Sequence, residues 1–135
     1  MSAFADTSGL YALMVKSEER HEEVARSFAD LLRKRRVLST TSYVIVETTA
    51  LLQHRIGLEV VHDFEEQIVP FLAIEWVAQA LHRRGVEMLF REDRRQLSLV
   101  DCVSLEFMKS SRLRDVLGLD PHFQEAGFRL LPPRK

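Results

Sequence analysis

Cysteine is nearly absent from this sequence, and so are long apolar runs. The chain has a single cysteine, Cys102, inside the apolar run LSLVDCVSLEF. One cysteine cannot form a disulfide framework within the chain, so we expect a buried structural thiol in a reducing compartment. No run approaches the roughly 20 apolar residues of a membrane span, and no basic segment followed by a long apolar stretch opens the chain. These absences predict a cytoplasmic protein with no membrane contact.

An excess of basic charge is also missing. The formal net charge is -1 and the pI is about 6.5, which excludes a protein that coats nucleic acid through charge alone. Any contact with nucleic acid must therefore be local. Five glycines and four prolines leave few breaks, and no Ser/Gly-rich linker or repeat occurs in the 135 residues. With 46% hydrophobic residues, the chain is predicted to form a single domain over residues 1–135.

Short apolar segments alternate with longer segments of helical spacing. Such alternation predicts an α/β protein with three layers, α/β/α, around a short central parallel sheet. The expected strands cover residues 3–5, 36–41, 71–74, 115–119 and 128–131. The expected helices cover residues 7–14, 18–36, 42–57, 58–69, 75–90 and 97–112, with a helical turn at 121–127. In such sheets, ligands bind beyond the carboxyl ends of the strands.

Four acidic residues stand apart from the solvated helix faces that hold most of the others. Asp6 and Asp120 end predicted strands, Glu47 is the only charge in SYVIVETTALL, and Asp101 interrupts LSLVDCVSLEF. An unpaired buried carboxylate is costly, and the neighbouring positions supply almost no Lys or Arg. Two strand ends and two helices can bring all four acids to one edge of a parallel sheet. Their mutual repulsion would raise their pKa values unless a divalent cation were present.

Oxygen ligands without a histidine or thiolate cluster favour Mg²⁺ or Mn²⁺ over zinc. Such a site supports phosphoryl transfer to a metal-activated water. From the residues alone, each acid could instead be a helix cap or half of an ion pair.

The ordered segments FADTSGLYAL, STTSYVIVETTALL, LSLVDCVSLEFM and VLGLDPHFQEAGFRLL resemble the PIN-domain ribonucleases, especially the VapC-type toxins of prokaryotic toxin–antitoxin pairs. The resemblance spans nearly the whole chain. It implies a PIN-like fold in which Asp6, Glu47, Asp101 and Asp120 are the catalytic, metal-binding acids. It further implies a Mg²⁺- or Mn²⁺-dependent endoribonuclease whose water attacks in line and leaves a 5′-phosphate and a 3′-hydroxyl. The implied partners are an RNA substrate, a cognate antitoxin and a second copy in a homodimer.

Two hydroxyl residues follow the first acid. Thr7 and Ser8 are candidates for orienting Asp6 or contacting a phosphate, although Ser8 could equally cap the first helix. The chain departs from the family at Gly118, where a Thr or Ser commonly stands two residues before the last Asp. The hydroxyl expected beside Asp120 is then missing.

Basic side chains gather at two places. RKRR (33–36) closes a predicted helix, where cations favour the dipole. Arg91, Arg94 and Arg95 precede the helix of Asp101 and are candidates for contact with the RNA backbone. The five histidines show no metal-ligand spacing and are treated as ordinary. Apolar residues of the early helices suit either the core or an interface with a partner, namely Leu10, Tyr11, Met14, Val24 and Phe28.

Three other functions compete with this interpretation. A phosphoacceptor receiver domain needs adjacent acids after its first strand, an Asp after its third and a Lys after its fifth. Here the third strand ends in Glu75-Trp76 and the last strand runs into FRLLPPRK, so the pattern fails. A catalytically silent PIN-like module that binds RNA or protein remains an alternative, although all four acids are present. A housekeeping RNA-processing nuclease is the third, and a small antitoxin gene beside this one would separate it from a toxin.

Overall fold

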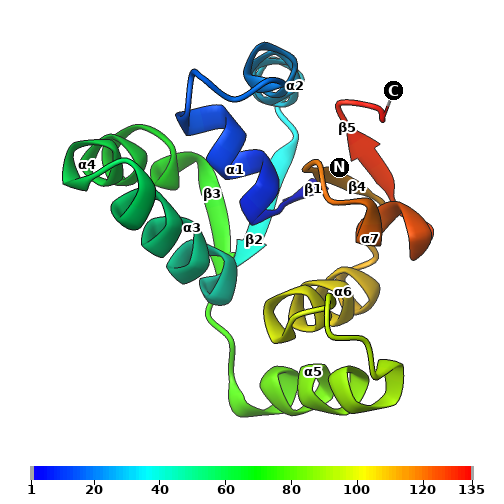
Figure 1. Cartoon of the computed structure of the whole chain (residues 1–135). Coiled ribbons are helices and arrows are strands. Elements are labelled where there is room, and N and C mark those ends of the chain that lie inside the picture. Colours follow the sequence, from blue (N-terminus) through cyan, green and yellow to red (C-terminus); the bar gives the residue numbers. More distant parts are fainter. Residues whose placement is uncertain (1, 135) are drawn as a thin grey trace.

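A computed structural model describes residues 2–134 and contains one five-stranded, wholly parallel sheet (Figure 1). Its strands lie in the order β3-β2-β1-β4-β5. Their bounds are Ser2–Ala5 (β1), Val37–Thr41 (β2), Leu72–Glu75 (β3), Asp115–Leu117 (β4) and Arg129–Leu131 (β5). The predicted α/β class with a short central parallel sheet is confirmed.

Helices connect consecutive strands and flank the sheet (Figure 1). They are α1 (Thr7–Met14), α2 (His21–Arg33), α3 (Ser42–Arg55), α4 (Leu58–Gln67), α5 (Gln79–Glu92), α6 (Leu99–Ser111) and α7 (Pro121–Glu125), with a 3₁₀ turn at Val69–Phe71. In Figure 1, α3 and α4 lie on the left of the sheet, whereas α5 and α6 lie below and to the right. The chain thus adds β2 and β3 on one side of β1. It then returns through α5 and α6 and adds β4 and β5 on the other side.

This reversal lies between β1 and β4, which are neighbours in the sheet although more than a hundred residues separate them. In open parallel sheets the crevice beyond the carboxyl ends of the strands, where the order reverses, is the usual ligand site. Asp6 follows β1 and Asp120 closely follows β4. The topology therefore places these two acids on either side of that crevice.

An aromatic cluster fixes the elements around the crevice. Phe4 of β1 is fully buried, and its ring centroid lies 5.9 Å from that of Phe107 in α6 and 6.1 Å from that of Phe123 in α7. Aromatic pairs at such distances add stability beyond the area they bury. Because Phe4 is two residues before Asp6, the same cluster holds α6 and α7 in position beside that acid.

Helix α1 packs closely on the end of β4, and Gly9 permits this approach. A Cβ atom at Gly9 would lie 2.3 Å from the carbonyl oxygen of Leu117. No side chain fits there, so glycine is required for α1 to reach the sheet edge. The close contact brings Asp6 and Ser8, at the start of α1, against the segment that follows β4.

Two helices begin three or four residues later than predicted. The helix expected at 18–36 runs only from His21 to Arg33, since residues 17–20 form a turn and Arg35 has a positive φ of 55°. The helix expected at 75–90 begins at Gln79. Glu75 pairs with Thr41 in the sheet, and the Val77 N–H donates to Ser42 Oγ at 2.9 Å, so the chain between them stays extended.

Several apolar residues of the early helices belong to the core. Leu10 and Val24 are fully buried and Phe28 is 9% exposed, so these three cannot form a surface for a partner. Tyr11 and Met14 are only partly buried.

Cys102 is fully buried as predicted, and burial raises the pKa of its thiol to about 11. Within residues 2–134, no helix has both the length and the apolar character needed to cross a membrane.

Candidate metal centre

The acids predicted from the sequence line one cavity at the carboxyl ends of β1 and β4. Its volume is about 370 Å³. Asp6, Glu47, Asp101 and Asp120 all contribute to its wall. The other lining residues are Thr7, Ser8, Tyr11, Glu18, Leu51, Arg55, Ser98 and Leu119.

Asp6 is the most buried of the four acids, with 3% of its surface exposed. Its backbone N–H donates to Leu117 O at 3.1 Å, which continues the hydrogen bonding between β1 and β4. Its side chain caps α1, where Oδ2 accepts from the Ser8 N–H at 3.2 Å and from Ser8 Oγ at 2.7 Å. Burial raises the pKa of this carboxyl to about 7, with smaller contributions from the charges of Asp101 and Asp120.

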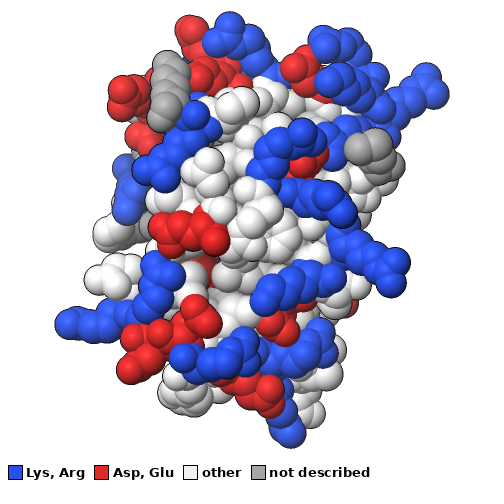
Figure 2. All heavy atoms as spheres, turned by 90° about the vertical axis from the view of Figure 1, so that its right-hand side faces the viewer, with Lys and Arg blue, Asp and Glu red and all other residues white. Residues whose placement is uncertain are grey.

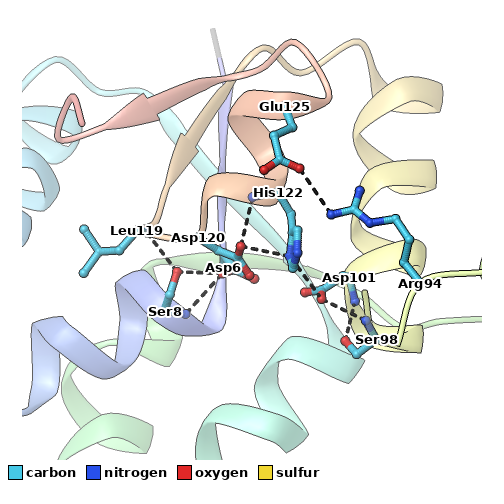
Figure 3. A network of polar contacts seen from close by, with 9 residues as sticks. All are labelled: Asp6, Ser8, Arg94, Ser98, Asp101, Leu119, Asp120, His122 and Glu125. Atoms are coloured by element: carbon cyan, nitrogen blue, oxygen red, sulfur yellow. Dashed lines mark hydrogen bonds and ion pairs between the residues drawn. The ribbon is translucent and has the colours of Figure 1, made fainter. Parts of the chain in front are cut away.

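Asp101 lies in the first turn of α6 as part of a capping box (Figure 3). Its Oδ2 accepts from the Ser98 N–H at 3.0 Å, and its own N–H donates to Ser98 Oγ at 3.1 Å. These reciprocal bonds fix the carboxylate at the start of the helix. Burial and the charge of Asp120 raise the pKa of Asp101, while the Ser98 hydrogen bonds oppose the shift.

Asp120 and His122 complete a tight group with Asp101. Asp120 caps α7, and its Oδ1 accepts from the His122 N–H at 2.9 Å. Oδ1 also lies 2.9 Å from His122 Nδ1, which is 3.8 Å from Asp101 Oδ2. The buried Nδ1 makes no hydrogen bond of good geometry, although Asp120 lies close to it. One potential ligand atom from each of these three residues lies within 4.8 Å of the others.

His122 was missed because the sequence gives no pair of histidines with metal-ligand spacing. The signal that could have found it is its place two residues after a strand-end Asp, in DPHF. An Asp at the helix cap directs the following turn back toward its own carboxylate. Figure 3 shows the His122 ring between Asp120 and Asp101.

Glu47 lies on α3 and reaches the same cavity from the opposite wall. It is half-buried, and it falls outside the group whose ligand atoms lie within 4.8 Å of one another. Asp6 also falls outside that group. The four predicted acids thus share a cavity, while only Asp101 and Asp120 form the tight group with His122.

The two hydroxyls after Asp6 have different environments. Ser8 Oγ donates to Asp6 and accepts from the Leu119 N–H at 2.9 Å, so it ties α1 to the segment after β4. The cap of α1 is Asp6 itself, and Ser8 is therefore not the cap. Thr7 is buried, and its Oγ1 accepts from Thr48 Oγ1 of α3 at 3.3 Å. Ser8 orients Asp6, whereas Thr7 links α1 to the helix of Glu47.

Gly118 explains the departure from the family pattern. A Cβ at this position would lie 3.2 Å from both Asp6 Cβ and Ser8 Oγ, which is tighter than most real contacts. A larger residue would press on the hydroxyl that holds Asp6. Ser8 Oγ lies beside Gly118, where it is bonded to Asp6 and to the Leu119 N–H.

The three arginines proposed for RNA contact lie outside the wall of this cavity. Arg91 and Arg94 line a different cavity of about 150 Å³, whose wall includes His122. Arg94 Nη2 lies 3.3 Å from Glu125 Oε1, and Arg95 is exposed.

Sequence reasoning also missed two charged residues that do line the acid cavity. Glu18 comes from the turn before α2, and Arg55 comes from the last turn of α3.

A larger hollow of about 670 Å³ lies beside the start of α2. Its lining is mostly exposed and charged, and it brings together no buried carboxylates. We therefore place the chemistry in the smaller acid cavity. The hollow is lined by Lys16, Glu18, Glu19, His21, Glu22, Glu23 and Arg26.

The donor set of the acid cavity fits a divalent cation that prefers oxygen ligands. Carboxylates dominate, and one imidazole nitrogen stands beside them, which suits Mg²⁺ or Mn²⁺. Burial and like charges hold the pKa of Asp6 near 7. A cation would remove that electrostatic conflict.

Comparison with known proteins finds a solved structure that is similar to this chain over nearly its whole length. No model of a protein family matches the sequence, and no curated protein matches it. The crystal structure of VapC20 of Mycobacterium tuberculosis, described as a sarcin-ricin loop cleaving toxin, superposes with a TM-score of 0.82. The two sequences are 29% identical over 94% of this chain and 96% of that chain.

The sheet order and the acids at its reversal point define a PIN-like α/β protein. The likeness to VapC20 further confirms the resemblance to VapC-type PIN-domain proteins that the four motifs predicted.

Proposed function

We propose that this chain is a metal-dependent endoribonuclease and the toxin of a toxin–antitoxin pair. The observation that carries the proposal is the convergence of Asp6, Glu47, Asp101 and Asp120 on one cavity. The likeness to VapC20, an RNA-cleaving toxin, supports it. RNA, an antitoxin and a second copy of the chain are the partners that this function implies. Such a toxin would act in the cytoplasm.

Asp6, Asp101 and Asp120, with Glu47, would hold Mg²⁺ or Mn²⁺, and His122 stands close enough to join them. A bound cation would lower the pKa of a water ligand and neutralise charge on the phosphate. Ser8 holds Asp6 in place, and Ser98 holds Asp101. Asp6 must lose its proton before it can ligate a cation, so activity at a limiting concentration of the cation is expected to rise with pH through about 7.

RNA also requires positive surface charge near the cavity. Figure 2 shows basic side chains spread over the face of the molecule that carries β4, β5 and α7, with acidic ones among them. Local basic regions of this kind can bind phosphates although the net charge of the chain is close to zero. Arg91, Arg94 and Arg95, which lie outside the wall of the acid cavity, remain candidates for such contacts.

The experiment that tests the activity is cleavage of a structured RNA pool by the purified chain. Reactions contain Mg²⁺ or Mn²⁺, with EDTA as control and Asp6→Asn as the matched variant. Cleavage that needs the metal and is lost in the variant is expected. Equal cleavage by both proteins would place the activity elsewhere. RNA binding without cleavage, in protein shown to be free of antitoxin, would instead identify a silent binding module.

The toxin role has a separate test in cells. Induced expression of the chain should arrest growth, whereas Asp6→Asn should not. Co-expression of the small gene beside it should restore growth if that gene encodes the antitoxin. Cleavage in vitro without growth arrest would favour a housekeeping nuclease.

A further inference from the structure

One basic side chain from the described part of the chain lines the acid cavity. Five acids line it, namely Asp6, Glu18, Glu47, Asp101 and Asp120, and among residues 2–134 the only Lys or Arg in its wall is Arg55. A phosphodiester strand entering this cavity meets strong negative charge. A bound cation would offset part of that charge near the reacting phosphate only. The lone arginine therefore lies where a phosphate of the strand would most need a cation.

Arg55 lies along the same stripe of α3 as Glu47. Glu47, Leu51 and Arg55 are spaced four residues apart, and all three line the cavity. Residues at this spacing share one face of a helix. Eight residues of helix correspond to a rise of about 12 Å, so the stripe leads from the acids toward the cavity rim. Arg55 thus stands beside the path of a strand whose reacting phosphate is at the acids.

Tyr11 of α1 holds the Arg55 guanidinium in this position. The guanidinium carbon lies 5.4 Å from the centroid of the Tyr11 ring, and both residues line the cavity. The interaction of a cation with an aromatic face restrains the long side chain. No ion pair is found for Arg55 among residues 2–134. Its hydrogen-bond donors are therefore left for a ligand, and a guanidinium can bind a phosphate through two of them.

We infer that Arg55, held in place by Tyr11, binds a phosphate of the RNA strand that flanks the phosphate to be cleaved. The inference rests on the proposed function and adds a second phosphate subsite to it. Tyr11 is a positioning residue, because it acts through Arg55. A basic residue in the last turn also stabilises a helix, so the test must measure substrate binding rather than stability.

Steady-state kinetics on a short RNA with one cleavage site test the inference. Arg55→Gln is expected to raise KM about tenfold and to leave kcat within about twofold, because one charge-assisted contact is lost. Arg55→Lys keeps the charge but loses the planar guanidinium with its two parallel donors. Its KM should therefore lie between those of wild type and Arg55→Gln. Arg83→Gln, an exposed arginine on α5 outside the cavity, is the matched control and should behave as wild type.

A chemically altered substrate makes the test sharper. Replacing the flanking phosphate by an uncharged methylphosphonate should raise KM of the wild type about as much as Arg55→Gln does. The same replacement should add little in Arg55→Gln, since the two changes remove one interaction. Tyr11→Leu should reproduce part of the Arg55→Gln effect and add nothing to it. Independent, additive effects of substrate and variant would overturn the inference.

Binding measured without cleavage separates this inference from the proposed function. Asp6→Asn and Asp6→Asn/Arg55→Gln are titrated with the same RNA at several salt concentrations. Loss of the Arg55 contact should weaken binding and reduce the salt slope by about 0.7, the value for one phosphate of a single strand. If wild type fails to cleave, the proposed function fails, and this titration still decides the subsite. Equal affinity and slope in the two variants would overturn it.

Discussion

Two buried aspartates lie at opposite ends of the sheet and are treated in opposite ways by the fold. Asp6 follows β1 at the carboxyl ends of the strands, and Asp115 begins β4 at the amino ends. Each is 3% exposed. Asp115 accepts hydrogen bonds from Arg36 at 2.8 Å and from Arg129 at 2.8 and 2.9 Å. Asp6 accepts only from Ser8 and lies near other acids.

The consequence is a pair of opposite pKa shifts. Hydrogen bonds from Arg129, and then from Arg36, lower the pKa of Asp115 despite its burial. Burial raises the pKa of Asp6 to about 7, because no basic residue compensates it. The protein's own arginines neutralise Asp115, which serves the structure. The charge of Asp6 has no such compensation, which is the arrangement expected of a site that binds a cation.

The largest effect expected from this difference is on activity. Asp6→Asn should lower RNA cleavage about a thousandfold, because a ligand of the cation is lost. Asp115→Asn should leave the activity of the folded molecules within about threefold of wild type. The measurement is cleavage with Mg²⁺ or Mn²⁺ at a temperature where both variants are folded. A comparable loss of cleavage activity in the two variants would show that the two aspartates do not differ in function.

The pH dependence of stability should also differ between the two acids. The folded pKa of Asp6 is raised, so its contribution to stability is present below about pH 4 and is lost as the pH rises through 7. The loss should reach up to about 4 kcal/mol in the metal-free protein. The folded pKa of Asp115 is lowered, so its contribution is lost only as the pH falls below the usual range of an aspartate.

Urea unfolding in EDTA at pH 4.5 and pH 8 measures this effect. Wild type should be less stable at pH 8, and Asp6→Asn should remove most of the difference. If the difference in stability between the two pH values persists in Asp6→Asn, groups other than Asp6 cause it.

Breaking the ion-pair cluster should destabilise the fold. Asp115→Asn leaves Arg36, whose side chain is 15% exposed, without its compensating charge. A cost of about 3 kcal/mol in the free energy of unfolding is expected. Arg129→Ala should cost less, because that side chain is 70% exposed and Arg36 remains in place. Thermal unfolding at pH 7 gives both values, and equal stability of Asp115→Asn and wild type would contradict the structural role.

The smallest effect concerns the hydroxyl that orients Asp6. Ser8→Ala removes the bond to Asp6 and leaves the Leu119 N–H without its acceptor. We expect a loss of about 1 kcal/mol in stability. Because the Ser8 hydrogen bond lowers the pKa of Asp6, its loss should move the rise of activity to higher pH. A pH–rate profile measures the shift, with Ser8→Thr as the control that keeps the hydroxyl. An unchanged profile in Ser8→Ala would show that Ser8 does not tune Asp6.

Much of the fold was predictable because its signals are local. Alternating apolar strands and amphipathic helices indicated a parallel sheet, and five strands were placed close to their observed positions. The start of α5 was predicted too early, since Glu75 is held in the sheet by pairing with Thr41, far away in the sequence. The early start predicted for α2 shows that charged residues at helical spacing do not mark where a helix begins.

The sequence by itself determined the acids Asp6, Glu47, Asp101 and Asp120, since an isolated charge in an apolar segment is conspicuous without any coordinates. It did not reveal His122 or Arg55, because each looks ordinary within its own helix. Only the tertiary structure decided that His122 stands between two of the acids and that Arg55 lies over Tyr11. The physical reason is that burial and charge compensation depend on residues brought together across the sheet, and local sequence does not record those distances.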